Sequence, residues 1–243
     1  MLETCVNQAA GLQALALESP PRLVALTSHG QQQGELPLLW SLCATWVELG
    51  FPVAVLDGQS HESEKNPGLL QWLEAPQSHV HEEYDSWTVI PSAEGFDHLL
   101  TQEYPTQVLG SLASHYAVVL IYANAKTVSR LLKGSGLSPL LLVAPLMASV
   151  LTAYQALKQL LLDAQLCPTV ANIALSSNAI MTTHASVQHL QDCAMTFLGY
   201  RLRPVAIRAA ATDDRSQDDI YRLAMQLLEN AMPLQRHFFV RGQ

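Results

Sequence analysis

The chain has 243 residues, of which 13 are Lys or Arg and 21 are Asp or Glu, so its formal net charge is −8. Charged residues make up only 14 % of the sequence and hydrophobic residues 49 %, which excludes global disorder and allows one large core. Because phosphate contacts need clustered Lys and Arg, an acidic chain without a basic block is a poor candidate for binding nucleic acid.

From residue 20 onward, apolar runs alternate with stretches of helical pattern. In chain order, we expect strands at 22–27, 52–56, 86–90, 117–122, 140–144, 170–175 and 204–207. The expected helices are 36–49, 68–74, 95–114 with a break near Pro105, 149–163, 184–198 and 212–230. About seven apolar strands separated by helices predict an α/β fold, with a doubly wound, mostly parallel sheet flanked by helices. No linker interrupts the alternation, so residues 20–243 are expected to form one domain after a short segment, residues 1–19.

Nothing in the sequence predicts export or a membrane span. The N-terminus has no basic stretch followed by an apolar one, so no secretory signal is expected. Residues 134–157 carry no charge and could cross a bilayer, but Pro139 and Pro145 interrupt them, and a buried strand followed by a helix is the interpretation we favour. The four cysteines are widely spaced, as is typical of reduced thiols. They are Cys5, Cys43, Cys167 and Cys193. We expect a cytoplasmic protein with at most peripheral contact with the inner face of the cell membrane.

The loop after the first strand is the first place to look for a site, because ligands of open parallel sheets bind beyond the carboxyl ends of the strands. Residues 27–37 read TSHGQQQGELP, which has the position and length of a phosphate-binding loop, GxxxxGK[ST]. Gly34 is kept just before the expected helix. His29 replaces the first Gly, Glu35 replaces the Lys that neutralises phosphate charge, and Leu36 replaces the Ser or Thr that holds Mg²⁺. An ordinary strand–helix loop is the alternative that this loop alone leaves open.

The order of the whole chain resembles the MinD/ParA family of deviant-Walker (SIMIBI) ATPases, and within it the flagellar-number regulators FlhG, also called FleN. Residues 20–59 look like that family's strand, phosphate loop, helix and second strand ending in Asp57. Residues 66–95 are similar to its "glldlL … vlpa..G" segment, and residues 149–160 to its "S-x-x-x-A-Y-x-x-I/L-K" helix. The resemblance implies a P-loop NTPase-like fold.

A segment ahead of the first strand resembles a signature of FlhG proteins, D-Q-A-x-x-L-R. Gln8, Ala9 and Leu12 match it, while Asn7 replaces the Asp and Gln13 replaces the Arg. In that family the segment forms a helix that binds the GTPase FlhF and stimulates it. The alternative is a short amphipathic helix that packs on the domain.

The family's catalytic positions are mostly replaced in this chain. The signature Lys falls at Gly30 and the phosphate-loop Lys at Glu35. Asp57 matches the first Asp after the second strand, but the Asp that positions the attacking water falls at Gln59, and the Asp closing the next switch strand falls at Tyr122. Because phosphoryl transfer depends on positioning and charge stabilisation, the resemblance implies a pseudo-ATPase with a degenerate nucleotide site and no catalytic or metal-binding residue.

The family's adenine-reading Asn falls near Ser176. Three further patterns are weaker. Residues 79–83 (HVHEE) lack a third metal ligand, and Ser28-His29 with Asp57 lacks the elbow of a nucleophile–base–acid set. Residues 216–230 resemble in position the membrane-targeting helix of MinD-like proteins, but the acids around their apolar face favour a packing helix.

We therefore expect a non-catalytic MinD/FlhG-like regulator of flagellar placement, number or biosynthesis that needs no cofactor. Its expected partners are proteins, an FlhF-like GTPase or flagellar components. One alternative is a nucleotide-dependent ATPase switch with altered ligands, which would bind ATP and Mg²⁺. The other is a MinD-like accessory protein of cellulose secretion (BcsQ-like) or of pilus machinery.

Overall fold

The computed structural model describes residues 20–30, 32–75, 86–144, 147–174, 180–208 and 214–235. Its strands are β1 (Arg22–Ser28), β2 (Val53–Asp57), β3 (Trp87–Pro91), β4 (Val118–Asn124), β5 (Leu140–Val143), β6 (Thr169–Ala174), β7 (Val205–Arg208) and β8 (Met232–Pro233). Its helices are α2 (Gln32–Glu48), α3 (Leu69–Glu74), α4 (Ala93–Leu99), α5 (Pro105–Leu112), α6 (Ala125–Leu132), α7 (Met147–Ala164), α8 (Ile180–Leu198) and α9 (Asp214–Glu229).

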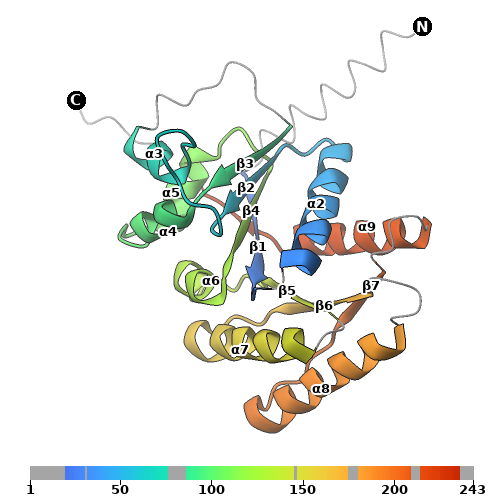
Figure 1. Cartoon of the computed structure of the whole chain (residues 1–243). Coiled ribbons are helices and arrows are strands. Elements are labelled where there is room, and N and C mark those ends of the chain that lie inside the picture. The colour runs from blue at the N-terminus through green and yellow to red at the C-terminus, as the bar shows by residue number, and fades with distance from the viewer. Residues whose placement is uncertain are drawn as a thin grey trace, which may run out of the picture. The chain divides into compact units, whose positions relative to one another are not determined.

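The strands form one sheet in the order β3-β2-β4-β1-β5-β6-β7, with β8 paired to β1 (Figure 1). The β2–β3, β1–β5, β5–β6 and β6–β7 pairs are parallel and the β1–β8 pair is antiparallel. The doubly wound, mostly parallel sheet flanked by helices is therefore confirmed. After β1 the chain moves to β2 on one side, and after β4 it moves to β5 on the other. In such sheets ligands bind at this reversal of strand order, beyond the carboxyl ends of the strands.

The described chain forms two compact units. The described residues of the first lie within 20–24, 46–75, 86–121 and 231–235, and those of the second within 25–45 and 122–230. Both β1 and β4 contribute residues to each unit. The boundary between a partner-binding segment and the domain at residue 20 stays a prediction, because residues 1–19 lie outside the described residues.

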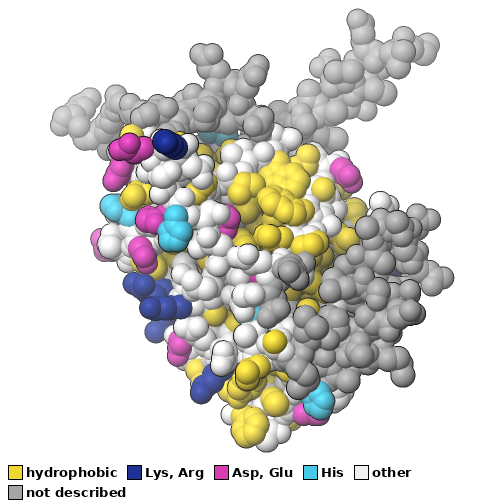
Figure 2. Space-filling model, viewed as in Figure 1, with side chains coloured by type: hydrophobic (Ala, Val, Ile, Leu, Met, Phe, Trp, Pro, Cys, Tyr) yellow, Lys and Arg dark blue, Asp and Glu magenta, His cyan; other side chains and the backbone are white. Residues whose placement is uncertain are grey.

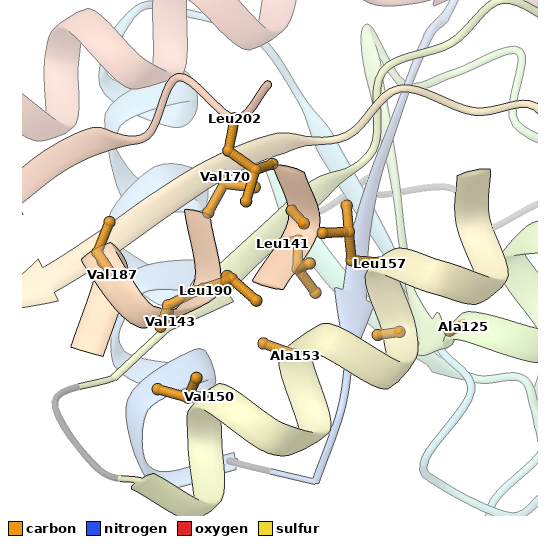
Figure 3. Close-up of a cluster of buried hydrophobic side chains, with 12 residues drawn as sticks. Ala125, Leu141, Val143, Val150, Ala153, Leu157, Val170, Val187, Leu190 and Leu202 are labelled. Atoms are coloured by element: carbon orange, nitrogen blue, oxygen red, sulfur yellow. The ribbon is translucent and has the colours of Figure 1, made fainter. Parts of the chain in front are cut away.

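The core of the second unit lies where α7 and α8 pack on β5 and β6 (Figure 3). Small side chains, Ala153 and Ala156 on α7 and Ala194 on α8, let these helices approach the strands closely. The cluster is completed by Ala125, Leu141, Val143, Val150, Leu157, Val170, Val187, Leu190 and Leu202. The uncharged stretch 134–157 thus forms a buried strand followed by a helix, as expected. Among the described residues, no helix is both long and apolar enough for a membrane crossing.

The start of α2 differs from expectation. Helix α2 begins at Gln32 rather than Leu36, so Pro37 lies inside the helix although its ring favours the first turn. The break expected near Pro105 is present, because the stretch 95–114 forms two helices: α4, which ends at Leu99, and α5, which begins at Pro105.

Helix α6 and strand β8 were not expected at all. Strand β4 continues to Asn124, whose side chain accepts a hydrogen bond from the backbone N–H of Thr127 (2.9 Å) and so caps α6 without an intervening loop. Strand β8 is only two residues long, and its pairing with β1 defines it.

Candidate functional site

The connection from β1 to α2 is shorter than expected. Strand β1 ends at Ser28 and α2 begins at Gln32, so the open loop that a phosphate would need over residues 27–37 is partly helix. Gly30 sits in the connection with φ +89°, a left-handed conformation that glycine adopts without strain. Gly34 lies in the first turn of α2, where an added Cβ would meet only the Cβ of Ala144, at 3.7 Å. Gly34 is therefore not required by the backbone geometry of this turn.

The side chain of Glu35 fills the space beside this connection and is only 1 % exposed. Its Oε2 accepts hydrogen bonds from the hydroxyl groups of Ser28 (2.7 Å) and Tyr122 (2.7 Å). Its Oε1 accepts one from the backbone N–H of His29 (3.0 Å), and the Nε2 of His29 lies 3.5 Å from the same oxygen. Both carboxylate oxygens are thus held by donors from β1, the connection and β4.

These donors explain how a carboxylate can be buried here. A buried charge is costly unless it is hydrogen-bonded, and charge-assisted bonds to an anion are roughly twice as strong as neutral ones. Glu35 also lies in the first turns of α2, whose N-terminus carries partial positive charge. Backbone N–H groups and a helix N-terminus are what proteins use to hold phosphate. Here the anion is supplied by the chain itself.

His29 connects this carboxylate to two neighbouring elements. Its Nε2 donates to the carbonyl oxygen of Leu142 on β5 (2.6 Å), and its Nδ1 lies 2.8 Å from the hydroxyl of Thr152 on α7. The side chain of His29 is 2 % exposed. The imidazole therefore contacts β5 and α7. A nucleophile–base pair would require it to contact the Ser28 hydroxyl instead.

The structure brings three of the site residues expected from the sequence into contact: His29, Glu35 and Tyr122. Tyr122 lies inside β4, two per cent exposed, and not at the end of the strand. Leu36 is half-buried on α2 and Gly30 is exposed. Sequence reasoning missed the hydroxyls of Ser28 and Thr152 as part of this network. No local pattern could find Thr152, which is 123 residues away from His29 along the chain.

Asp57 and Gln59 lie in the first unit, in the turn after β2. Asp57 Oδ1 accepts from the backbone N–H of Gln59 (2.9 Å) and Oδ2 accepts from the Ser60 hydroxyl (2.6 Å). The carboxylate of Asp57 thus stabilises its own turn. Gln59 contributes its backbone to that turn.

The same loop is fastened to two helices by one carboxylate that sequence reasoning also missed. Glu62 accepts hydrogen bonds from the N–H groups of Leu70 on α3 (3.3 Å) and of Glu94 (2.9 Å) and Gly95 (2.8 Å) on α4. Neither helix has a side-chain cap at its own N-cap residue. Glu62 therefore satisfies the donors of both helix N-termini from outside.

Glu94 in turn binds the loop that carries Glu62. It accepts from the backbone N–H of Glu62 (2.9 Å) and from the exposed His61 ring (2.6 Å). Hydrogen bonding with the Glu62 side chain, and next with His61, lowers the pKa of Glu94 from 4.5 to about 2. The bond to Glu94 raises the pKa of His61 above its ordinary value.

A Glu94→Gln variant is expected to lose stability at neutral pH but not in acid. Because the folded-state pKa is depressed, the ionised Glu94 stabilises the fold above pH 4.5, and this contribution disappears as the pH falls towards 2. The group is 43 % exposed, so solvent screening limits the loss to about 1 kcal/mol or less. Urea unfolding at pH 6 and pH 3 measures the gap. Glu64→Gln, on the exposed part of the same loop, is the control. A gap that widens in acid would contradict the assignment.

The remaining expected features lie outside the described residues: the segment Asn7–Gln13, residues 79–83 and Ser176. In the part of the chain that the structure describes, no group of three or more His, Cys, Asp or Glu side chains could hold a metal ion.

No protein-family model and no curated protein matches the sequence, but solved structures match its fold. The MinC:MinD cell division protein complex of Aquifex aeolicus contains a chain that superposes with TM-score 0.60 at 14 % identity, over 89 % of this chain and 100 % of that one. The chain has a MinD-like fold. The McdA–ATP complex of Cyanothece gives TM-score 0.55 at 15 % identity, over 89 % of this chain and 100 % of that one.

A third similar structure has a different activity. Cobyrinic acid a,c-diamide synthase of Mycobacterium smegmatis, with bound ADP and magnesium, gives TM-score 0.55 at 14 % identity, over 89 % of this chain and 100 % of that one. At such identities the likeness shows the fold alone, and function has to be argued from the site.

Proposed function

We propose that this chain is a MinD/FlhG-like regulator with a degenerate nucleotide site, which acts through protein contacts and needs no nucleotide. The observation that carries the proposal is the Glu35 carboxylate, which accepts hydrogen bonds from Ser28, His29 and Tyr122 beside the N-terminus of α2. In P-loop folds this is the place for a nucleotide phosphate.

Two electrostatic reasons oppose a phosphate at this place. A second anion about 4 Å from the carboxylate would be repelled by about 4 kcal/mol at the effective dielectric constant of a protein surface. Glu35 occupies the position at which a lysine would offset the phosphate charge, and Leu36 has no hydroxyl for Mg²⁺. The residues present do not fit a nucleotide–magnesium complex.

The turn after β2 supports the same proposal. In nucleotide-dependent switches such loops become ordered through contacts with the γ-phosphate and Mg²⁺. Here the carboxylates of Asp57 and Glu62 hold the loop through backbone N–H groups of the chain itself. These hydrogen bonds within the chain occupy both carboxylates.

The flagellar role rests on the sequence resemblance to FlhG, above all on the match at Gln8, Ala9 and Leu12. One of the similar structures is a complex of MinD with a protein partner, MinC. A protein partner for this chain agrees with that precedent. We assign the contact with an FlhF-like GTPase to the segment Asn7–Gln13.

GTPase stimulation tests the role and the nucleotide independence in one experiment. The full chain is added to an FlhF-type GTPase with GTP and Mg²⁺ present throughout, either with or without ATP, and the formation of GDP is followed. We expect equal stimulation in both conditions and loss of stimulation with Gln8→Ala or with residues 1–19 deleted. A thermal melt with ATP, ADP and Mg²⁺ is run beside it and is expected to show no shift.

Each other outcome removes a defined part of the proposal. Stimulation that depends on ATP, or dimerisation induced by ATP, would favour the alternative of an ATPase switch with altered ligands. The ATP and ADP in the McdA and diamide synthase structures make that alternative worth testing. Absence of any binding or stimulation would remove the flagellar mechanism and leave the fold assignment intact.

A further inference from the structure

The charges of this acidic chain are unevenly distributed. No Asp or Glu occurs between Glu103 and Asp163, whereas four of the 13 Lys and Arg residues do. These four are Lys126, Arg130, Lys133 and Lys158. All 21 acidic residues and the other nine basic residues lie outside this stretch or at its ends, and together they give the rest of the chain a formal charge of −12.

Three of these cations form a stripe along α6 and its C-cap residue, Lys133. Lys126, Arg130 and Lys133 are spaced by four and three residues, so they lie on one helix face, and all three are exposed. The opposite face of α6 is buried, and the Asn124 cap fixes its first turn. The stripe is about 10 Å long at 1.5 Å per residue. It is thus presented by a helix that is held firmly in the second unit.

The neighbouring helix extends the same charge. Helix α6 packs against α7 (Figure 1). Lys158 on α7 is exposed. Figure 2 shows Lys and Arg side chains gathered at one side of the face that it displays. Within the described residues, none of the four cations makes an ion pair or a hydrogen bond through its side chain. The basic face, Lys126, Arg130, Lys133 and Lys158, is therefore available to a partner.

We propose that the basic face on α6 and α7 is a docking surface for an acidic segment of a partner protein. Charge complementarity identifies the chemistry of the occupant and would speed its association. The length of the stripe suits about three residues of an extended peptide, at about 3.3 Å each. A nucleic acid or an anionic bilayer would extend beyond the stripe and meet the repulsion of the remaining −12 charge. This inference rests on the proposed function in one respect: a regulator that acts through protein contacts needs a surface that binds its partner.

Fluorescence anisotropy with labelled hexaglutamate tests the proposal on the full chain. We expect binding at 50 mM salt, and at least tenfold weaker binding by the Lys126→Glu/Arg130→Glu variant. The matched control is Arg201→Glu/Arg203→Glu, which changes the net charge equally at two exposed positions of the same unit and is expected to change affinity less than threefold. Circular dichroism and a thermal melt establish that both variants are folded. Hexalysine, a 20-base-pair duplex and vesicles with 30 % anionic lipid are measured in parallel.

The outcomes separate this inference from the proposed function. It is overturned if wild-type protein does not bind hexaglutamate or if both variants lose binding equally. It is also overturned if wild-type protein binds only the duplex or the vesicles and the α6 variant abolishes that binding. None of these results bears on nucleotide independence, which the GTPase experiment measures. The docking proposal is also overturned if the Lys126→Glu/Arg130→Glu variant binds hexaglutamate as tightly as the wild-type protein does.

Discussion

Replacing Glu35 by Ala is expected to lower the free energy of unfolding by about 3–5 kcal/mol, because three buried donors lose their carboxylate acceptor and each loss costs about 1–3 kcal/mol. Two hydroxyl groups and one backbone N–H point at this carboxylate. Truncation leaves Ser28, Tyr122 and the His29 amide with a void in place of their acceptor, and each buried donor then carries a desolvation penalty. Urea unfolding followed by circular dichroism measures the loss.

Graded variants distinguish the lost network from a simple cavity. Tyr122→Phe removes one donor and leaves the carboxylate with the others, so about 1 kcal/mol is expected. Glu48→Ala truncates an exposed Glu on the same helix and is expected to cost less than about 0.5 kcal/mol. If Glu35→Ala is as stable as Glu48→Ala, Glu35 does not hold the site, and the main support for nucleotide independence is lost.

The site illustrates what sequence comparison gives and what it leaves out. The resemblance places a Lys at position 35 and an Asp at position 122, and it marks both as replaced. It does not indicate that the replacements bond to each other at 2.7 Å, with the acceptor now on α2 and the donor on β4. A family pattern lists positions one at a time, whereas a donor–acceptor pair depends on both. For the same reason a lysine, which can only donate, does not suit position 35 among these donors.

The fold followed from the sequence where the signal was local. The apolar runs that form β1, β2 and β4 are continuous and buried, as in parallel sheets covered on both faces. Helix α6 was missed because it follows β4 directly, although Asn124 and the spacing of Val128, Leu131 and Leu132 carry a helix signal. The expected start of α2, Leu36, is four residues late, because the helix already begins at Gln32 and includes Pro37.

The glycines in the segment that resembles the family's "glldlL … vlpa..G" pattern provide the second large effect. Replacing Gly68 by Ala is expected to cost about 3 kcal/mol, at the upper end for overpacked sites. Its Cβ would lie 2.1 Å from the carbonyl oxygen of Pro91, at the end of β3, and 2.6 Å from Glu62 Cγ. A carbonyl oxygen in a strand cannot move as the end of a flexible side chain can, so the backbone must shift.

The cost reaches beyond a single contact because Glu62 also caps α3 and α4. A Cβ at Gly95 would meet the same Glu62 side chain at 2.8 Å and the Leu69 side chain at 2.6 Å. Both glycines therefore make room for one carboxylate, which gives a physical reason for the pattern in which they occur. Unfolding by urea is expected to show a lower midpoint for Gly68→Ala, with retained helix content.

Gly34→Ala is the matched control, because Gly34 is the glycine of the phosphate-binding pattern that is present in this chain. Its Cβ would make an ordinary 3.7 Å contact inside α2, so the substitution is expected to be neutral or to stabilise by up to about 1 kcal/mol through helix propensity. Equal destabilisation by both substitutions would contradict this assignment and would indicate that the β1–α2 connection needs a glycine at position 34. The expected contrast means that Gly68 is required by the close approach of Glu62 and of the Pro91 carbonyl oxygen, whereas the packing around α2 does not require a glycine at position 34.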